Sequence, residues 1–258
     1  MASASALPST SFRRASNGDL PGLDAAPRVP VIPTTSIGSR LRRLRRRPFF
    51  TIRNRLKRLY IDLQDRPYER RLGVRTALVT DALRDFDAQI QGHMATPYRL
   101  LDTVGRHMRD NGIAAPRFVD VGCGLGRPLY YFADRFEDLQ GFEIAAPLCA
   151  AAREQLEAVC AKNPGYARIA IHHADATTAV PLDQPMVLFF YNPFGPKPLV
   201  RLCARLRSAE QEIHLYYANP ALGEVLAAEM GRPADARLND WFDIVYYHIT
   251  PAGRWPGT

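Results

Sequence analysis

The sequence predicts an α/β protein whose mostly parallel sheet lies between two layers of helices. Short apolar runs alternate, from residue 117 onward, with segments of helical period, which is the order of a parallel sheet with right-handed crossovers. The most apolar run, residues 186–191, fits a central strand buried on both faces. Roughly 200 residues follow position 60, enough for one domain with an adequate core.

The first expected strand, residues 118–121, ends in a glycine-rich turn that reads Gly122-Cys123-Gly124-Leu125-Gly126. Glycines suit a turn in which a ligand lies against bare backbone and φ is positive. A dinucleotide fingerprint counted from Gly122 would need glycine at 127, where the chain has Arg127. Together with Asp120, the turn resembles motif I of the class I S-adenosylmethionine (SAM) methyltransferases, whose acid helps hold the methionine end of SAM. The plain alternative is a connecting β–α turn.

A second acid follows at the expected spacing. Residues 139–144 form a short strand in which Glu143 lies 19 residues after Gly124. A carboxylate there can accept hydrogen bonds from both ribose hydroxyls of an adenine nucleoside. This position does not separate SAM from NAD, and the alternative is an ordinary carboxylate at a strand end.

The third strand, near residues 167–173, ends in Ala174-Asp175-Ala176. The resemblance implies that Asp175 meets the adenine amino group and that the neighbouring amide, at Ala176, meets a ring nitrogen. Alternatively, Asp175 caps the short turn that follows. His172 and His173 point to opposite faces of a strand, so we expect both to be structural.

The fourth strand runs into Asn192-Pro193-Phe194 near the point where open α/β sheets bind ligands. The Asn192 side-chain oxygen and a neighbouring carbonyl can accept hydrogen bonds from an amine and orient its lone pair. The Phe194 ring can hold the substrate by stacking or cation–π attraction. The alternative is a proline turn with Phe194 in the core.

Residues 117–194 resemble the core of a class I SAM-dependent methyltransferase. Asn192-Pro193-Phe194 is similar to the (Asp/Asn)-Pro-Pro-(Tyr/Phe) motif of amino-group methyltransferases but lacks the second proline, which leaves the acceptor atom open. Residues 187–196 also resemble the strand and loop of the non-SET, seven-strand histone-lysine methyltransferases. The resemblance implies a Rossmann-like three-layer sandwich, SAM as cofactor, and N-methylation of an amine, a protein lysine or another nitrogen.

The remaining elements complete this fold. We expect a helix over 198–208, a strand over 212–217, a helix over 221–230 and a last strand over 241–249. Pairing of the last strand with one near 236–239 would give the seven strands of the family. Upstream, helices are expected over 76–90 and 98–108, and in this superfamily such a segment often folds over SAM. Thr96 and Tyr98 would then contact the cofactor, and His93 is either a base or without a role; the alternative is a plain helix–helix loop.

The charge is concentrated at the N-terminus. Residues 1–60 hold 13 Lys and Arg against 2 Asp and Glu, whereas the rest of the chain holds 21 against 24. We therefore predict a disordered basic arm over 1–60, a helical lid segment over 61–110 and a SAM-binding methyltransferase core over 111–258. The stretch Arg40–Arg58 could bind nucleic acid, an anionic membrane or an acidic protein through charge, or be a solvated tail.

No apolar stretch is long enough to span a bilayer, and the four cysteines show no metal-ligand spacing. We expect reduced thiols, no metal site and a cytoplasmic protein, with organellar targeting by the arm as the alternative. The substrate would be a protein or small-molecule amine, with RNA as an alternative. Two other functions remain: an NAD oxidoreductase, disfavoured by Arg127, and a basic binding module that keeps a SAM fold.

Overall fold

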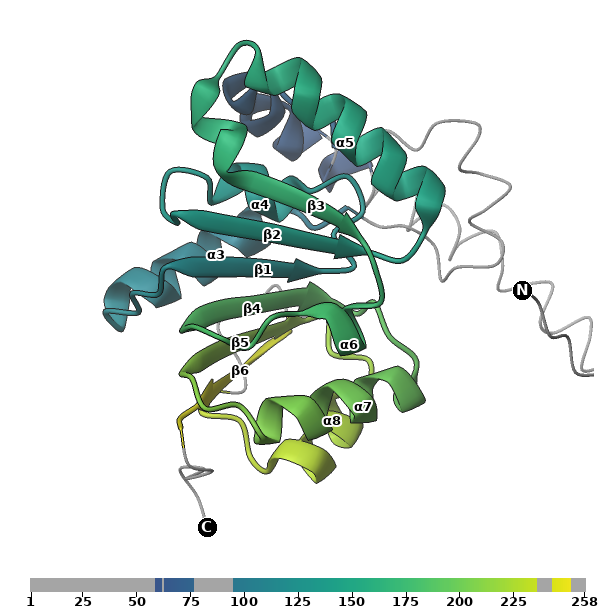
Figure 1. The fold of residues 1–258 in the computed structure, drawn as a ribbon. Coiled ribbons are helices and arrows are strands. Elements are labelled where there is room, and N and C mark those ends of the chain that lie inside the picture. Colours follow the sequence, from purple (N-terminus) through teal and green to yellow (C-terminus); the bar gives the residue numbers. More distant parts are fainter. Residues whose placement is uncertain (1–58, 62, 77–94, 236–242, 252–258) are drawn as a thin grey trace, which may run out of the picture. The chain divides into compact units, whose positions relative to one another are not determined.

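In this computed structural model, the described residues are 59–61, 63–76, 95–235 and 243–251. They form one six-stranded sheet with the order β3-β2-β1-β4-β5-β6 (Figure 1). The strands are β1 (Arg117–Val121), β2 (Asp138–Glu143), β3 (Ile169–His173), β4 (Met186–Tyr191), β5 (Ile213–Ala218) and β6 (Ile244–Ile249). The first five are parallel, and β6 pairs antiparallel with β5. The predicted α/β architecture, with a mostly parallel sheet, is confirmed.

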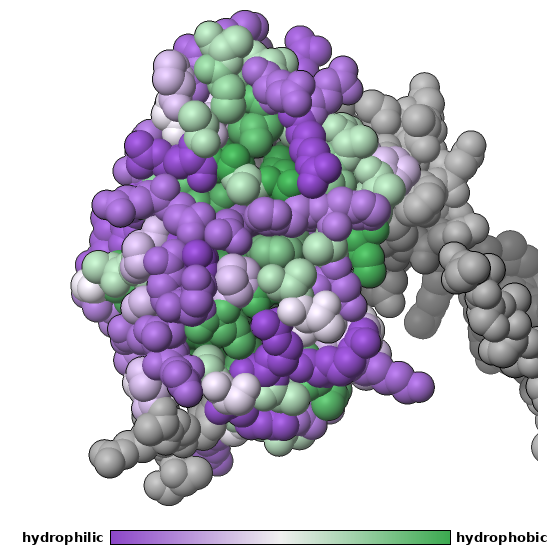
Figure 2. Space-filling view, viewed as in Figure 1, coloured by the Kyte–Doolittle hydropathy of each residue, from purple (hydrophilic) through white to green (hydrophobic). Residues whose placement is uncertain are grey.

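Helices cover both faces of the sheet (Figure 1). One core contains side chains of α3 (Tyr98–Asp110), α4 (Arg127–Tyr131) and α5 (Ala146–Cys160), and the other those of α6 (Ala176–Ala179), α7 (Pro196–Arg207) and α8 (Gly223–Met230). A 3₁₀ turn, η1 (Pro164–Arg168), leads into β3. Hydrophilic side chains cover much of the face shown in Figure 2, as expected for the outer sides of such helices.

Alternation along the strands divides the core into two layers. Phe118 of β1 packs into the layer of α3 and α4, whereas Val119 and Val121 of the same strand pack into the layer of α7. Successive side chains of a strand point to opposite faces, so each apolar run supplies both layers at once. Five of the six β4 residues are buried, which agrees with the central strand expected over 186–191.

Two predicted elements fall partly or wholly outside the described residues. The sheet has six strands among the described residues. The seventh strand, expected near 236–239, falls in the segment 236–242, which is not described, and stays a prediction. Asp235, just before that segment, forms an isolated antiparallel bridge with Tyr246 of β6. The helix expected over 76–90 lies almost entirely in the undescribed segment 77–94.

A helix precedes this region, and most of it lies in the segment 61–110 that we predicted to be helical. Residues 59–61 and 63–72 are helical. The first two of these residues belong to the stretch 1–60 that we assigned to the basic arm. Tyr68 of this helix stacks on Tyr98 of α3, with ring centroids 4.9 Å apart and planes 4° apart. The hydroxyls of Tyr68 and Tyr131 both donate to the carboxylate of Asp102. Aromatic stacking and a shared acceptor therefore hold this helix against α3 and α4.

No helix among the described ranges is both long and apolar enough to cross a bilayer.

The packing of α4 on the sheet predicts a measurable effect at Gly141. A β-carbon at Gly141 would lie 2.7 Å from Leu129 Cδ1 and 2.8 Å from Cys123 Sγ, both on buried residues. We expect Gly141→Ala to lower the free energy of unfolding by about 1–3 kcal/mol through overpacking. Chemical denaturation measures this change. Gly195→Ala is the matched control, because its β-carbon meets no atom within 4 Å; equal effects of the two substitutions would contradict the packing described here.

Candidate functional site

The glycine turn between β1 and α4 has a left-handed backbone at each of its three glycines. Gly122, Gly124 and Gly126 have φ angles of 69°, 53° and 78°, in the left-handed region that side chains with a β-carbon rarely adopt. The amides of Gly122 and Cys123 both donate to the Phe142 carbonyl, at 2.8 and 3.1 Å. The turn is thus tied to β2 and presents backbone rather than side chains at the carboxyl end of the sheet.

Glu143, at the end of β2, closes this turn from the other side. Its Oε2 accepts a hydrogen bond from the Gly124 amide at 2.9 Å, and its Oε1 accepts one from the Ala145 amide at 2.8 Å. The carboxylate is buried, and each oxygen keeps a second lone pair for a further donor such as a ribose hydroxyl. The next residue, Ile144, is 65% exposed and offers an apolar surface beside the carboxylate.

Asp120 has a buried carboxyl with an unpaired oxygen. The residue is only 3% exposed, and its Oδ2 has no hydrogen-bond partner. Burial, reinforced by the charge of Glu143, raises the pKa of this carboxyl well above its ordinary value. A cationic donor beside Asp120 would reverse this shift, because it would satisfy the free oxygen and favour the ionised form.

A small cavity adjoins this carboxyl. It measures about 30 Å³, enough for one or two waters, and is lined by Thr76, Ala95, Thr96, Asp120, Gly122, Cys123, Leu125, Arg127, Pro128 and Tyr191. The lining combines the glycine turn, the end of β4 and residues on both sides of the undescribed segment 77–94. The free oxygen of Asp120 can accept a hydrogen bond from a cationic group that takes up the room of one water, such as the ammonium of an amino-acid-like ligand.

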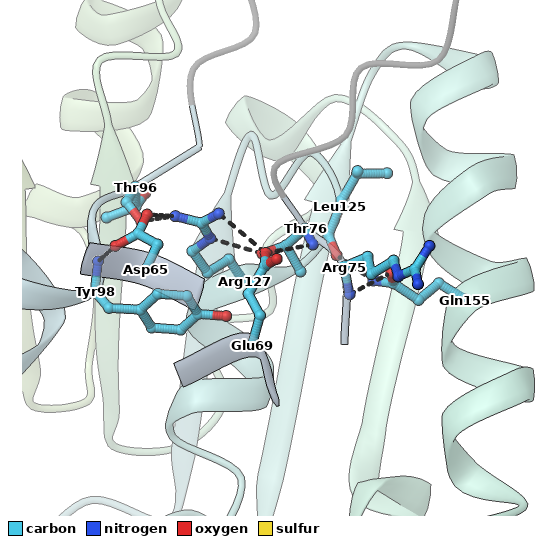
Figure 3. Close-up of polar contacts among 9 residues, drawn as sticks. All are labelled: Asp65, Glu69, Arg75, Thr76, Thr96, Tyr98, Leu125, Arg127 and Gln155. Carbon is cyan, nitrogen blue, oxygen red and sulfur yellow. Dashed lines mark hydrogen bonds and ion pairs between the residues drawn. The ribbon is translucent and has the colours of Figure 1, made fainter. Parts of the chain in front are cut away.

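Arg127, directly after the turn, is one of the residues that line this cavity, and Figure 3 shows its polar contacts. Its guanidinium forms ion pairs with Asp65 and Glu69 of the helix at 59–72 and lies 4.6 Å from the centre of the Tyr98 ring. It also donates to the Thr76 hydroxyl at 2.6 Å and to the Thr96 carbonyl at 2.9 Å. Arg127 is only 3% exposed. This buried side chain therefore connects the glycine turn to the helix at 59–72, to Thr76 and to Thr96.

The two predicted lid residues occupy different positions. Thr96 lines the cavity, and its carbonyl accepts from Arg127. The Tyr98 ring is fully buried between Arg127 and Tyr68, and its amide donates to Asp65 at 3.2 Å. Tyr98 therefore supports Arg127 in this structure, and a contact with the cofactor stays a prediction for both residues. His93 lies outside the described residues.

The loop after β4 lies against the glycine turn. A β-carbon at Gly122 would lie 2.6 Å from Cβ of Pro193, so the two loops are in close contact. Asn192 has a left-handed φ of 50°. Its Oδ1 accepts from the Tyr217 hydroxyl at 2.7 Å, and that hydroxyl accepts from the Leu222 amide at 3.1 Å. The Tyr217 hydroxyl therefore joins the loop after β4 to Leu222, just before α8.

Phe194 and Asp175 both show the structural roles that we weighed as alternatives. The Phe194 ring is half-buried, packs against the α7 layer and lies 5.8 Å from the Phe190 ring. Asp175 caps α6, its Oδ1 accepting from the Thr177 amide at 2.9 Å and the Thr177 hydroxyl at 2.8 Å. Burial acts to raise the pKa of Asp175, but the Thr177 hydrogen bonds and the charge of Arg201 together outweigh it, and the pKa is lowered. Asp175 and the buried Ala176 remain predicted adenine contacts.

Cys123 belongs both to the core and to the lining of the cavity. It is buried, and burial raises the pKa of its thiol well above the ordinary value. Its side chain packs against Gly141, and the residue also lines the cavity beside Asp120, so a contact of Cys123 with the cofactor stays a prediction.

Sequence reasoning missed Tyr191, Ile144 and the partners of Arg127. The interpretation of Arg127 as merely a missing glycine overlooked that an arginine buried after such a turn needs acids elsewhere. Asp65 and Glu69 are spaced i and i+4 on one helix, a signal that was present in the sequence.

The unpaired carboxyl of Asp120 predicts an unusual pH dependence of stability. Because its pKa is raised on folding, the folded chain binds a proton that the unfolded chain has released, and Asp120 lowers stability as the pH rises above its unfolded pKa. We expect the melting temperature of Asp120→Asn, relative to wild type, to increase between pH 4 and pH 8 by on the order of 2–4 °C. Thermal melts at several pH values measure this. The exposed Asp134→Asn is the control, and a pH-independent difference for Asp120→Asn would contradict the burial described here.

Comparison with known proteins gives similarity to solved structures only. No family model matches this sequence, and no curated protein matches it. The chain is similar to a putative rRNA methylase from Clostridium thermocellum, at 13% identity over 58% of this chain and 95% of that chain, with a TM-score of 0.43. It is also similar to an RNA methyltransferase from Salinibacter ruber in complex with S-adenosyl-L-homocysteine (15% identity, 64% and 98% covered, TM-score 0.41).

A third solved structure is described as a ribosomal protein L11 methylase from Lactobacillus delbrueckii subsp. bulgaricus (15% identity, 56% and 75% covered, TM-score 0.40). All three are described as methylases or methyltransferases, with differing acceptors where one is named. Identities this low, with TM-scores below 0.5, assign this chain neither a family nor an acceptor, and the resemblance to the histone-lysine type stays a prediction.

Proposed function

We propose that this chain is a SAM-dependent methyltransferase that transfers a methyl group to an amine nitrogen. The observation that carries the proposal is the unpaired Oδ2 of Asp120 in a cavity bordered by the left-handed glycine turn. A buried carboxylate oxygen without a donor is costly, so such a group is expected where a ligand supplies the donor. The amino group of the cofactor's methionine end has the charge and the hydrogens to do so.

The remaining cofactor contacts follow from the strand ends. Glu143 would accept from the ribose hydroxyls through its free lone pairs, and Ile144 would give a flat base an apolar surface. Asp175 and Ala176, at the end of the neighbouring strand, would meet the edge of that base. When bound, SAM supplies an electrophilic methyl group on a positively charged sulfur.

The chain's own contribution is to position the acceptor and exclude water. The Pro193–Gly122 contact puts the loop after β4 beside the turn that would hold the cofactor. Asn192, oriented by Tyr217, keeps one side-chain lone pair for an N–H of the acceptor amine, so the nitrogen lone pair can point toward the methyl group. The nitrogen held in this way would take up the methyl group that the cofactor supplies, with the sulfur keeping the electron pair of its broken bond, and the amine proton would leave to solvent. Alignment of this kind is worth several kcal/mol of the barrier.

Four classes of acceptor carry a nitrogen that Asn192 could orient. A protein lysine, another protein nitrogen, a small-molecule amine and an RNA base all present a nitrogen of suitable size to Asn192. The basic stretch at 40–58 lies outside the described residues, and we propose that it recruits an acidic substrate or surface. Deletion of residues 1–58 tests this: loss of turnover on a macromolecular acceptor, with cofactor binding retained, supports recruitment.

Cofactor binding is the first prediction of this proposal. We expect wild type to bind S-adenosylhomocysteine with micromolar affinity in calorimetric titration and to show no heat with NAD. Gly124→Arg should abolish binding, because the side chain would fill the turn where the ligand lies. Gly112→Arg is the matched control, since Gly112 has a similar φ of 61° and open space around it. Absence of binding to wild type, or loss of binding in both variants, would contradict the proposed cofactor.

Acceptor positioning is the second prediction. We expect Asn192→Ala to lower kcat by about 10²-fold while leaving the affinity for S-adenosylhomocysteine nearly unchanged. Asn219→Ala is the control, because Asn219 also precedes a proline, has the same φ of 50° and follows the neighbouring strand. Radiolabelled methyl transfer to a screened acceptor gives the rates. Equal losses in the two variants would show that Asn192 matters only for its backbone conformation.

A further inference from the structure

A second polar cluster lies far from the cofactor site, where β5 begins and β6 ends. It consists of Glu212, His214 and His248, whose possible ligand atoms all lie within 4.8 Å of one another. β5 runs parallel to β4, so its first residues lie at the opposite edge of the sheet from the glycine turn and Asn192 (Figure 1). The cluster therefore takes no part in the chemistry proposed above.

The pairing of β5 and β6 builds this cluster. His214 and His248 are directly opposite each other in the antiparallel register, and Glu212 precedes His214 by two residues. A period of two places Glu212 and His214 on one face of the extended chain, and the cross-strand pair adds His248 to the same face. The two imidazole rings stack with centroids 4.8 Å apart and planes 10° apart.

The possible ligand atoms of the three side chains lie close together. Glu212 Oε1 lies 2.6 Å from His248 Nε2 and 3.5 Å from His214 Nε2. The other nitrogen of His214, Nδ1, forms a 2.8 Å hydrogen bond with the Tyr246 hydroxyl. Metal-bound histidines typically make such a bond through their second nitrogen, because it fixes the tautomer and the orientation of the ring.

We propose that Glu212, His214 and His248 bind a zinc ion that joins the edge strand β6 to β5. Two imidazoles and one carboxylate are the ligand set of three-ligand zinc sites, and a water would occupy the fourth position. Zn–N and Zn–O bonds of about 2.0–2.2 Å place tetrahedral ligands roughly 3.3–3.5 Å apart, so shifts of about an ångström suffice. His214 is buried, whereas the side chains of His248 and Glu212 are 34% and 42% exposed, which leaves an entry path from solvent.

The ligand set favours zinc over the common hard cations. Magnesium and calcium prefer all-oxygen sites, whereas imidazole nitrogen suits zinc and its neighbours in the first transition series. The cluster was not apparent from the sequence, because His248 lies far along the chain from Glu212 and His214. We had expected no metal site because the cysteines lack the spacing of metal ligands. Antiparallel pairing of the last strand brings it to the other two residues.

The test is titration of the untagged, chelator-treated full-length chain with Zn²⁺, followed by calorimetry. We expect one equivalent to bind with a Kd of micromolar or tighter and to raise the melting temperature by roughly 5–10 °C at 100-fold excess over Kd. Co²⁺ in place of Zn²⁺ should give the visible absorption of a tetrahedral site. His248→Ala should weaken binding at least about 100-fold, more than the loss of an outer partner costs. The exposed His173→Ala should bind as wild type does.

Glu212→Gln separates metal binding from simple hydrogen bonding. A glutamine oxygen can still accept from His248, but a neutral amide is a poor zinc ligand. If the cluster is only a hydrogen-bonded network, this variant keeps the melting temperature of wild type and zinc stabilises neither protein. The proposal is overturned by that result, by zinc binding that survives His248→Ala, or by cobalt spectra with sulfur-ligand bands that disappear in Cys160→Ser.

Discussion

The buried guanidinium of Arg127 is the constraint on which the candidate site depends. Four of its hydrogen bonds reach three separate parts of the chain: the helix at 59–72, Thr76 and Thr96. Removing such a charge from water is costly, and burial raises the pKa of Asp65 more than Arg127 lowers it. The network therefore holds these parts in a defined arrangement more than it adds stability, because any rearrangement would leave a charge buried without its partner.

Thr76 and Thr96 flank the segment 77–94, so both ends of that segment meet at the same guanidinium. Arg127 in turn follows the glycine turn directly. A displacement of Thr76 or Thr96 would thus change the hydrogen bonds of Arg127 and the lining of the cavity beside Asp120. This is a physical route by which cofactor binding and the predicted lid would influence each other.

Local patterns predicted the strands, the glycine turn and the acids at the strand ends, because each depends on a few consecutive residues and on the period of two or of 3.6. The roles of Asp175 as a cap and Phe194 as a partial core residue were among the alternatives that the sequence left open. The Arg127 network and the cluster of Glu212, His214 and His248 were not predicted. Both join residues far apart in the chain, and only the strand order and the packing of the helix at 59–72 bring them together.

The contact between Gly122 and Pro193 has a consequence for how such a site can diverge. One residue belongs to the turn that would hold the cofactor and the other to the loop that would hold the acceptor, and the space between them is too small for one more methyl group. The two positions are therefore expected to change together during descent: a side chain at 122 requires both a strained backbone and a smaller or displaced residue at 193. Substitutions that reshape the loop for a new acceptor are therefore limited to those that leave the glycine turn unchanged.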